Sequence, residues 1–299
     1  MYIWLNGNIL KADEVTVNVL SSTLHYGIGV FEGERAYLTA DGPSIFRLDA
    51  HTERLFRSAN IIGMDIPFNE QEISAATRQV VRVNNYSAAY IRPLVFYGHE
   101  HIGFTSEGLS IHVAIAAFPR DTVFESLHTK NGLRVQVSKF KRVHSHPDLN
   151  LVKATGNYLG SVLAHRAALA CGFDEALLLD NEDYISEGAR ENIFVVINGI
   201  ICTPKLNSAL PGITRDTIIR LAHDNGIAVY EIDLSVQDLM KADEAFFTGS
   251  GVEIMAIKSV DNCLIGDGFT GPITQLLFKL YHAAVSGCNQ TYTEWNTPC

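Results

Sequence analysis

Hydrophobic positions in the first 118 residues change between the two-residue period of a strand and the longer period of a helix. Runs rich in apolar, β-branched and aromatic residues are typical of strands. Such runs predict strands at 1–10, 32–38, 88–97 and 110–117. We therefore expect the N-terminal part of the chain to be built around a β-sheet.

Two helices are predicted between these strands, because apolar residues recur there every three or four positions. Asp49 is placed to cap the first helix, and Asn69 with Glu72 forms a capping-box start for the second. The two apolar stripes consist of Leu55, Ala59 and Ile62, and of Ile73, Ala76, Val80 and Val83.

The second part of the chain follows a stretch of turn residues with weak periodicity at 119–132, which we interpret as an interdomain loop. Helices are predicted at 156–171, 213–225 and 272–285. Strands are predicted at 133–139 and 175–180, after a turn at 181–183 as far as 197, and at 200–203, 227–232 and 244–248. Residues 286–299 look like a loose polar tail. The sequence thus predicts a two-domain protein of the α/β class, in its α+β form, with a small domain at 1–118 and a larger one at 133–299.

Composition and charge narrow the range of partners. The chain has 299 residues, 47% hydrophobic and 19% charged, which is ordinary for a globular protein. Its formal net charge of −10 opposes binding to nucleic acid or to anionic membranes. The N-terminal residues lack a secretory signal, so we expect a soluble cytoplasmic protein. Five scattered cysteines without a Cys-x-x-Cys pair indicate reduced thiols rather than disulfides or a zinc site.

Lys153 is the first candidate for chemistry. It precedes the small residues Ala154, Thr155 and Gly156 at a predicted helix start, so its amine has room to lie in a pocket and to form an imine with a carbonyl compound. Burial and a nearby cation would favour the neutral amine that this chemistry needs. The alternative is a solvated lysine at a helix entrance.

Glu187 is the second candidate, since it ends an alternating run and is followed by Gly188, which allows the backbone to turn. A carboxylate in this position suits a protonated pyridine nitrogen, which it would keep protonated. Glu191 is a rival for that role. Glu187 would otherwise be a solvated acid at a strand end.

Two glycine-bearing turns have the character of anion sites. Residues 211–214, Pro-Gly-Ile-Thr, precede an apolar helix, whose N-terminal N–H groups and dipole favour a phosphate. A Pro-Gly turn with a threonine cap is the alternative. Residues 248–251, Thr-Gly-Ser-Gly, form a second turn after a strand. Arg54 lies beside the buried stripe of its helix and would reach inward to a phosphate, unless it is simply exposed.

Tyr90 and Arg92 share one face of a strand by the two-residue period. The arginine can pair bidentately with a carboxylate, although the two residues would equally suit a water-facing rim.

Other patterns favour different functions less well. Residues 27–33 resemble a dinucleotide fingerprint, but the third glycine falls one position late and no strand precedes the run. The pairs His99 with His101 and His144 with His146 lack a standard ligand spacing, so we interpret them as loop histidines and predict no metal.

Taken in order, these segments resemble the class IV aminotransferases, the fold-type IV enzymes that use pyridoxal 5'-phosphate (PLP), and within them the branched-chain amino acid aminotransferases. The resemblance runs from about residue 24 to residue 287. Its segments are 25–27, 31–33, 89–94, 153–158, 184–192, 209–216 and 249–253. It implies a D-amino acid aminotransferase-like fold and PLP as the cofactor, with the PLP lysine in the domain predicted at 133–299.

The resemblance also implies a role for each candidate residue. Lys153 would bind PLP covalently and act as the general acid and base. Tyr158 would donate a hydrogen bond to the cofactor's phenolate oxygen, and Glu187 would pair with its pyridine nitrogen. The phosphate would be held by Arg54, Gly212, Ile213, Thr214 and Ser250. The substrate would be bound by Tyr26, Phe31, Tyr37, Tyr90, Arg92, Ser250, Gly251 and Val252.

The implied activity is reversible transamination between leucine, isoleucine or valine and 2-oxoglutarate, giving branched 2-oxo acids and L-glutamate, in a homodimer or larger homo-oligomer. D-amino acid or (R)-amine transaminases and aminodeoxychorismate lyases share the fold and are the nearest alternatives. A nicotinamide-dependent dehydrogenase and a non-catalytic PLP-binding protein are alternatives of other classes. Glu34 and Arg190 depart from the family pattern and bear on the substrate range.

Overall fold

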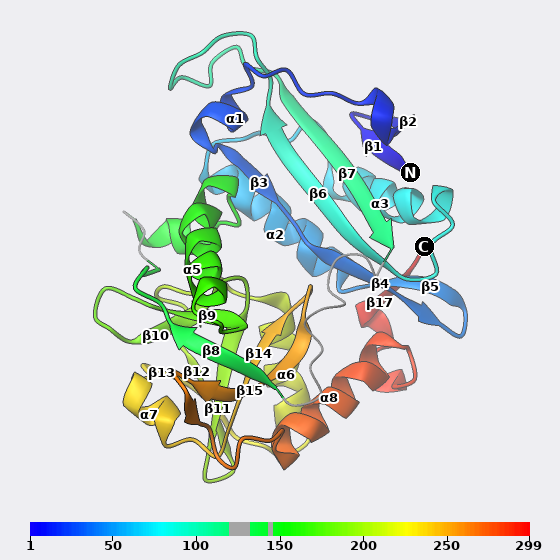
Figure 1. The fold of residues 1–299 in the computed structure, drawn as a ribbon. Helices are drawn as coiled ribbons and strands as arrows, with labels where there is room; N and C mark the ends of the chain where they lie inside the picture. The colour runs from blue at the N-terminus through cyan, green and yellow to red at the C-terminus, as the bar shows by residue number, and fades with distance from the viewer. Residues whose placement is uncertain (120–131, 143–145) are drawn as a thin grey trace. The chain divides into compact units, whose positions relative to one another are not determined.

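A computed structural model describes residues 1–119, 132–142 and 146–299, and it contains two β-sheets, each packed against helices (Figure 1). The predicted mixture of helix and sheet is confirmed. Almost all of the predicted loop at 119–132 lies outside the described residues, as does His144. None of the helices in the described ranges combines the length and apolar character needed to cross a membrane.

Residue contacts divide the chain into two compact units. The first unit combines Met1–Val123, Val152–Asn157 and Ala284–Cys299, and the second combines Phe124–Leu151 and Tyr158–Ala283. Lys153 thus lies in the first unit, whereas the sequence prediction places it in the second domain. The local reason is that the backbone around Lys153 pairs with the first sheet: Phe31 N–H donates to Lys153 O at 3.1 Å, and Ala154 forms a bridge with Val30.

The first unit contains an antiparallel sheet in the order β17-β5-β4-β6-β7-β1-β2, with β3 also paired to β6. Its strands are β1 (Tyr2–Leu5), β2 (Asn8–Lys11), β3 (Gly29–Phe31), β4 (Glu34–Thr39), β5 (Gly42–Phe46), β6 (Ala89–Tyr97), β7 (Ile111–Pro119) and β17 (Asn296–Pro298). The predicted single strand at 1–10 is two strands, because Asn6 and Gly7 both take positive φ (47° and 92°) and turn the chain.

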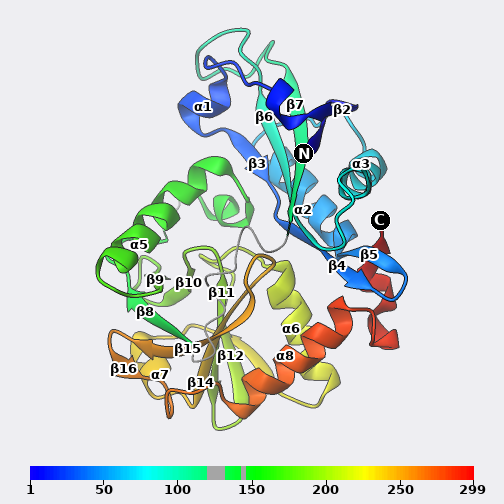
Figure 2. The ribbon, with the colours of Figure 1, turned by 45° about the vertical axis from the view of Figure 1, so that its right-hand side comes forward.

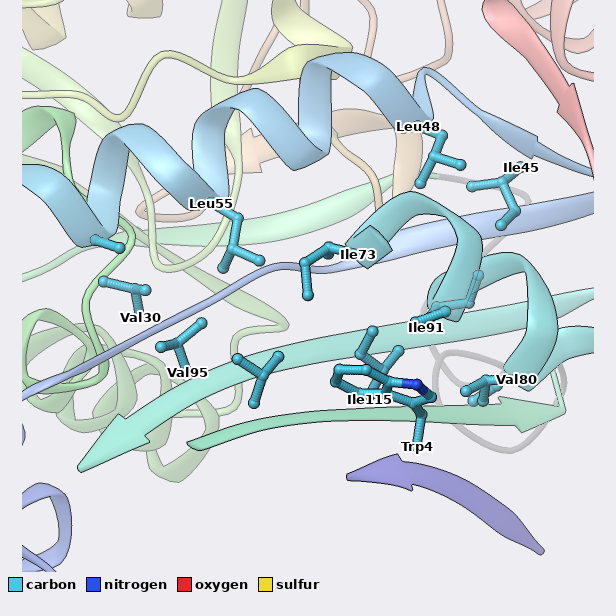
Figure 3. Packing of buried hydrophobic residues seen from close by; sticks show 14 of the residues in the cluster. Trp4, Val30, Ile45, Leu48, Leu55, Ile73, Val80, Ile91, Val95 and Ile115 are labelled. Atoms are coloured by element: carbon cyan, nitrogen blue, oxygen red, sulfur yellow. The ribbon is translucent and has the colours of Figure 1, made fainter. Parts of the chain in front are cut away.

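Among the described residues, the α-helices of this unit are α1 (Ser22–Tyr26), α2 (Leu48–Ile61) and α3 (Glu70–Val83). Figure 3 shows the core beneath α2 and α3, where Leu55 and Ile73 face Val30, Ile91 and Ile115 of the sheet. All five side chains are at most 1% exposed. Burial of this apolar surface is the main stabilising contribution to the unit.

The two helix starts differ in how well they were predicted. The capping box is confirmed: Glu72 N–H donates to Asn69 Oδ1 at 2.9 Å, and Asn69 N–H donates to Glu72 Oε2 at 2.8 Å. Asp49 as an N-cap is wrong. The N-cap residue of α2 is Arg47, which has φ 55°, and Asp49 lies in the first turn. The chain turns early because Arg47 N–H donates to Trp295 O.

The predicted loose tail at 286–299 is also wrong. It forms the 3-10 helix η5 (Gln290–Trp295) and then β17, which pairs with β5. The rings of Tyr292 and Trp295 stack at 4.2 Å, and Tyr292 is buried. The average polarity of this segment concealed the aromatic residues that fix it.

The second unit contains a mixed sheet in the order β10-β9-β8-β15-β14-β11-β12-β13. Its strands are β8 (Leu133–Val137), β9 (Glu175–Leu179), β10 (Ile185–Gly188), β11 (Asn192–Ile197), β12 (Ile200–Pro204), β13 (Val229–Ile232), β14 (Glu244–Gly249), β15 (Glu253–Val260) and β16 (Cys263–Leu264). Strand β8 runs parallel to both β9 and β15, and β12 runs parallel to β13. The sequence prediction missed β15, which links the two halves of this sheet.

The helices of this unit are α5 (Tyr158–Ala170), α6 (Ile213–Asp224), α7 (Val236–Met240) and α8 (Pro272–Val285). Helix α5 packs against β9, as the turned view in Figure 2 shows. Helix α6 packs against β13 and β14. The helix predicted at 156–171 starts later, because residues Thr155–Asn157 form the separate 3-10 turn η4.

Candidate active site

Lys153 has a fixed backbone and a partly buried side chain. Its N–H donates to Ser58 Oγ on α2 at 3.2 Å, and its carbonyl accepts from Phe31 N–H on β3 at 3.1 Å. Its Nζ lies 4.8 Å from the centroid of the Phe31 ring. An amine held over an aromatic ring by a backbone tied on both sides is oriented for chemistry, whereas a solvated lysine at a helix entrance has no such restraint.

Arg54, which lies on α2 like Ser58, belongs to a buried cluster of ionisable groups with His51 and Glu32. It donates from Nε to Glu32 Oε1 at 2.6 Å and from Nη2 to Glu32 Oε2 at 2.8 Å, while His51 Nδ1 lies 2.7 Å from Oε2. Burial alone would raise the pKa of Glu32, but Arg54 and then His51 outweigh it and hold that pKa far below its usual range. Burial lowers the pKa of His51, against the attraction of Glu32, so the ring is neutral.

The sequence analysis missed Glu32 as the partner of Arg54 and did not single out His51 or Ser58. The available signal was their spacing, since His51, Arg54 and Ser58 follow one another at helical intervals on the buried side of α2. An arginine beside a histidine and a serine on an otherwise apolar face marks a polar site.

Tyr90 and Arg92 on β6 lie together, as their spacing predicted. Arg92 Nη2 donates to the Tyr90 hydroxyl at 2.6 Å, and the Arg92 guanidinium lies 4.8 Å from the Phe31 ring centroid. Gly33 faces the Tyr90 hydroxyl so closely that an added Cβ would collide with it. Tyr90 is 7% exposed and Arg92 is only partly exposed, so they do not form a water-facing rim.

The other two tyrosines predicted for this region differ from each other. Tyr37 on β4 is buried at 4% exposure. Tyr26 at the end of α1 is 37% exposed, and its ring lies 5.1 Å from that of Phe104.

In the second unit, Glu187 on β10 is buried and contacts Arg142 and Leu210. Its Oε1 lies 2.7 Å from Arg142 Nε, and its Oε2 accepts from Leu210 N–H at 2.9 Å. The side chains of Arg142 and Glu187 are only 5% and 7% exposed. An arginine and an N–H donor both stabilise the carboxylate form, so Glu187 is not a solvated strand-end acid. No local pattern pointed to Arg142.

Glu191, the rival carboxylate, has a different environment. Burial, and then the nearby Glu175, raise the pKa of Glu191 to about 8, although Arg190 opposes the shift. A group that is largely protonated at neutral pH is a poor counter-ion for a pyridinium. Glu187 is therefore the better candidate of the two.

The N-terminus of α6 forms the candidate phosphate turn. Gly212 is its N-cap residue and provides no side-chain cap, while Ile213 and Thr214 are the first residues of the helix and are buried. Thr214 is thus not the cap. Gly212 has no room for a Cβ, because Asn192 Oδ1 occupies that position. Asn192 Nδ2 in turn donates to Leu210 O at 2.9 Å, so this turn is tied to the residue that contacts Glu187.

The second turn connects β14 to β15. Val252 N–H donates to Gly249 O at 3.1 Å, which closes the turn around Ser250 and Gly251. Glu253 then takes a left-handed conformation with φ 60°. Tyr158, the remaining candidate, is the first residue of α5 and is partly buried.

The structure gives no support to the rival patterns. Residues Ser22–Tyr26 form α1, and Gly27 is its C-cap with φ 68°, so the glycine run follows a helix. A dinucleotide site needs the run between a strand and a helix. Among the residues that the structure describes, no group of three His, Cys, Asp or Glu side chains is placed to hold a metal ion.

Comparisons with known proteins agree with this arrangement. The family model of class IV amino-transferases matches residues 29–260. A branched-chain-amino-acid aminotransferase of Pseudomonas aeruginosa is 45% identical over 99% of this chain and 96% of its own. The crystal structure of the Escherichia coli branched-chain amino acid aminotransferase has a TM-score of 0.95 at 40% identity, covering 99% of this chain and 98% of that one. The branched-chain aminotransferase of the thermophilic archaeon Thermoproteus uzoniensis, crystallised with norvaline, has a TM-score of 0.93 at 41% identity, covering 100% of this chain and 99% of that one. This chain therefore belongs to the class IV aminotransferase family.

Proposed function

We propose that this chain is a PLP-dependent branched-chain amino acid aminotransferase. It transfers an amino group reversibly between leucine, isoleucine or valine and 2-oxoglutarate, giving branched 2-oxo acids and L-glutamate. The three relatives described above are branched-chain aminotransferases at 40–45% identity over nearly the whole chain. The Thermoproteus uzoniensis relative was crystallised with norvaline, an aliphatic amino acid.

The single observation that carries the proposal is the group around Phe31. The Lys153 amine and the Arg92 guanidinium each lie 4.8 Å from the centroid of this ring. Arg92 also donates a hydrogen bond to the Tyr90 hydroxyl. A reactive amine, an apolar ring and a carboxylate-binding pair are the three things that a transaminase for both aliphatic amino acids and glutamate requires.

The donor set of the chain fits PLP. Lys153 offers an amine, Glu187 offers a buried carboxylate kept charged by Arg142, and α6 offers an N-terminus without a side-chain cap. When bound, PLP supplies the electron sink that stabilises negative charge at the substrate Cα. The helix dipole and N–H groups at Gly212, Ile213 and Thr214 favour the cofactor's phosphate, with Arg54 and Ser250 as further ligands.

Each residue then has a defined task. Lys153 would hold the cofactor through its amine, and its Nζ would accept and return the proton at the substrate Cα. Glu187, which is paired with Arg142 and accepts from Leu210 N–H, would lie against the ring nitrogen and stabilise its protonated form. Tyr158 would donate a hydrogen bond from its hydroxyl to the phenolate oxygen of the ring.

The substrate side has two requirements. Tyr26, Phe31 and Tyr37 present aromatic surface to an aliphatic side chain, while Arg92 with Tyr90 receives the side-chain carboxylate of glutamate. The α-carboxylate binds to the turn formed by Ser250, Gly251 and Val252 through N–H groups.

Two further expectations stay proposals. The predicted domains at 1–118 and 133–299 are proposed as the functional division. A homodimer or larger homo-oligomer is supported by the apolar side chains exposed around Tyr26, and the mass of the protein in solution tests it. Those side chains are Val17, Val19, Leu20, Leu24 and Phe104.

A panel of amino donors with 2-oxoglutarate tests the proposed function. We expect the purified holoenzyme to convert L-leucine, L-isoleucine and L-valine and to form L-glutamate, and borohydride to attach the cofactor to Lys153, as peptide mass would show. Turnover confined to D-amino acids or (R)-amines, or release of pyruvate from aminodeoxychorismate, would instead support the alternatives of the same fold.

Lys153→Ala is expected to lower transamination by at least about a thousandfold, since it removes both the covalent anchor and the base. Lys279→Ala on the exposed side of α8 is the matched control and should leave turnover unchanged. Substantial turnover in Lys153→Ala would contradict the assigned role.

A further inference from the structure

Two glutamates share the buried face of one strand segment. The pairing of β3 and β4 with β6 keeps a single register from Gly29 to Ala36, so side chains at alternate positions point the same way. On this face Glu32 and Glu34 lie between Val30 and Ala36, which belong to the hydrophobic core. Glu32 is 0% exposed and Glu34 is 1% exposed.

The two acids are compensated unequally. Glu32 accepts hydrogen bonds from Nε and Nη2 of Arg54, and its Oε2 also contacts His51 Nδ1. Glu34 lies opposite Ile91 of β6, and its Oε2 has no hydrogen-bond partner among the described residues. Leaving a buried oxygen without a donor strongly disfavours the charged form of a carboxyl group.

The charged groups around Glu34 reinforce this asymmetry. Burial, and then the negative charge of Glu32, raise the pKa of Glu34 well above its usual value, and Arg54 opposes them only in part. Lys153 acts on the cluster by lowering the pKa of His51. Beyond β5, Arg47 is directed to the Trp295 ring, 5.1 Å away.

The net charge of the whole cluster depends on whether Glu34 is protonated. With Glu34 protonated and His51 neutral, the negative charge of Glu32 balances the positive charge of Arg54. Ionised Glu34 would leave one excess negative charge in a site of low dielectric, where like charges repel strongly. Such a site would bind an anion poorly.

Building on the proposed function, we propose that Glu34 is a positioning residue that stays uncharged beside the Glu32–Arg54–His51 cluster and leaves Arg54 able to bind the cofactor's phosphate. Loss of the Glu34 proton weakens that binding. Nothing in the role of Arg54 alone requires this, since an apolar residue at position 34 would give phosphate binding without the pH dependence.

Linkage gives the size and the sign of the effect. Because the phosphate favours protonated Glu34, binding raises the proton affinity of that carboxyl. The dissociation constant then rises by up to about tenfold per pH unit once the pH exceeds the pKa of Glu34 in the cofactor-free protein. Below that pKa, Glu34 contributes no pH dependence.

The test compares the wild type with Glu34→Gln, which keeps the shape and removes the proton. The probe is pyridoxamine 5'-phosphate, because its amine forms no imine with Lys153, and its dissociation constant is measured on cofactor-free protein from about pH 6 to pH 10. Ionisation of the probe is the same for both proteins and cancels in their ratio. We expect wild type and variant to agree at the acidic end and to diverge at higher pH, with the wild type binding more weakly.

Two controls isolate the cause. Pyridoxamine, which lacks the phosphate, should show no divergence. Glu53→Gln removes an exposed carboxylate on α2 next to Arg54 in sequence and should follow the wild type. Glu34→Leu should behave like Glu34→Gln and serves if the amide variant does not fold.

The outcomes separate this inference from the proposed function. Parallel pH curves for wild type and Glu34→Gln, with pyridoxamine 5'-phosphate bound by both, would overturn the role of Glu34 alone. Lack of binding by the wild type at every pH would overturn the proposed function and this inference with it.

Discussion

Each unit buries a pair of glutamates, Glu32 with Glu34 in the first and Glu175 with Glu191 in the second, and all four are at most 2% exposed. In the first unit, Arg54 and His51 both contact Glu32, and the charge of Arg54 offsets only part of the pKa shift at Glu34. In the second unit, Arg190 is shared, with Nε 3.0 Å from Glu191 and Nη2 3.5 Å from Glu175.

The difference shows that the placement of a cation decides which buried acid is charged. Burial favours the protonated form of Glu32, Glu34 and Glu191 alike. Two short bonds from Arg54 reverse that effect at Glu32, whereas the pKa of Glu191 stays near 8 beside its shared arginine. A cation that pairs with one of two buried acids keeps that acid charged and leaves the other one neutral. An anion site next to Arg54 needs this difference in charge between Glu32 and Glu34.

Removing Arg54 from its ion pair with Glu32 should have the largest effect on stability. Arg54→Ala leaves the fully buried Glu32 without its cationic partner, so we expect the free energy of unfolding to fall by about 3–5 kcal/mol. Urea denaturation at pH 7 measures this fall.

The double variant Glu32→Gln with Arg54→Met is the control, because it removes both charges together. It should recover most of the lost stability, as replacing a buried ion pair costs less than breaking it. An Arg54→Ala protein that unfolds at the wild-type urea concentration would contradict the cluster's role.

The shared pair predicts a pH dependence of stability. The pKa of Glu191 is raised in the folded protein to about 8, whereas it is about 4.3 in the unfolded chain. Between these two values the folded state holds a proton that the unfolded state has lost. The contribution of Glu191 to stability is therefore fully present below about pH 4.3 and declines until the pH passes about 8. Glu32 has the opposite sign, since its lowered pKa contributes stability above about pH 4.3 that is lost in acid.

Glu191→Gln should remove that decline. We expect the variant to gain stability relative to the wild type as the pH rises from 5 to 8, in urea titrations at each pH. The nearby charge of Glu175 contributes to the raised pKa of Glu191, so the size of the change depends on that neighbour as well. Curves that stay parallel over this range would show that Glu191 is already ionised.

The sequence was informative where the signal was local. The capping box at Asn69, the spacing of Tyr90 and Arg92, and the Pro-Gly start of α6 depend on neighbouring residues, and the structure has all three. Lys153 and Glu187 were selected for the same reason, and their catalytic roles stay predictions.

The features that were not predicted from the sequence depend on residues that are far apart along the chain. Arg54 meets Glu32 across 22 positions, and Arg142 meets Glu187 only through the packing of the second sheet, so no periodicity marks either pair. Strand β15 was missed because it starts at Glu253, a charged residue with left-handed backbone. The tail at 286–299 was misjudged because its order comes from pairing with β5.

Arg190→Ala should have the smallest effect of the three changes. The Arg190 side chain is 36% exposed, so solvent screens its attraction, and we expect a loss of about 1 kcal/mol of stability. The pKa of Glu191 should rise further, because the group that lowers it is gone. Arg220→Ala, which breaks an exposed pair with Asp224 on α6, is the control and should cost about 0.5 kcal/mol or less. If Arg190→Ala instead cost as much as Arg54→Ala, the shared arginine would be as strongly coupled as Arg54, and the contrast between the two buried pairs would not hold.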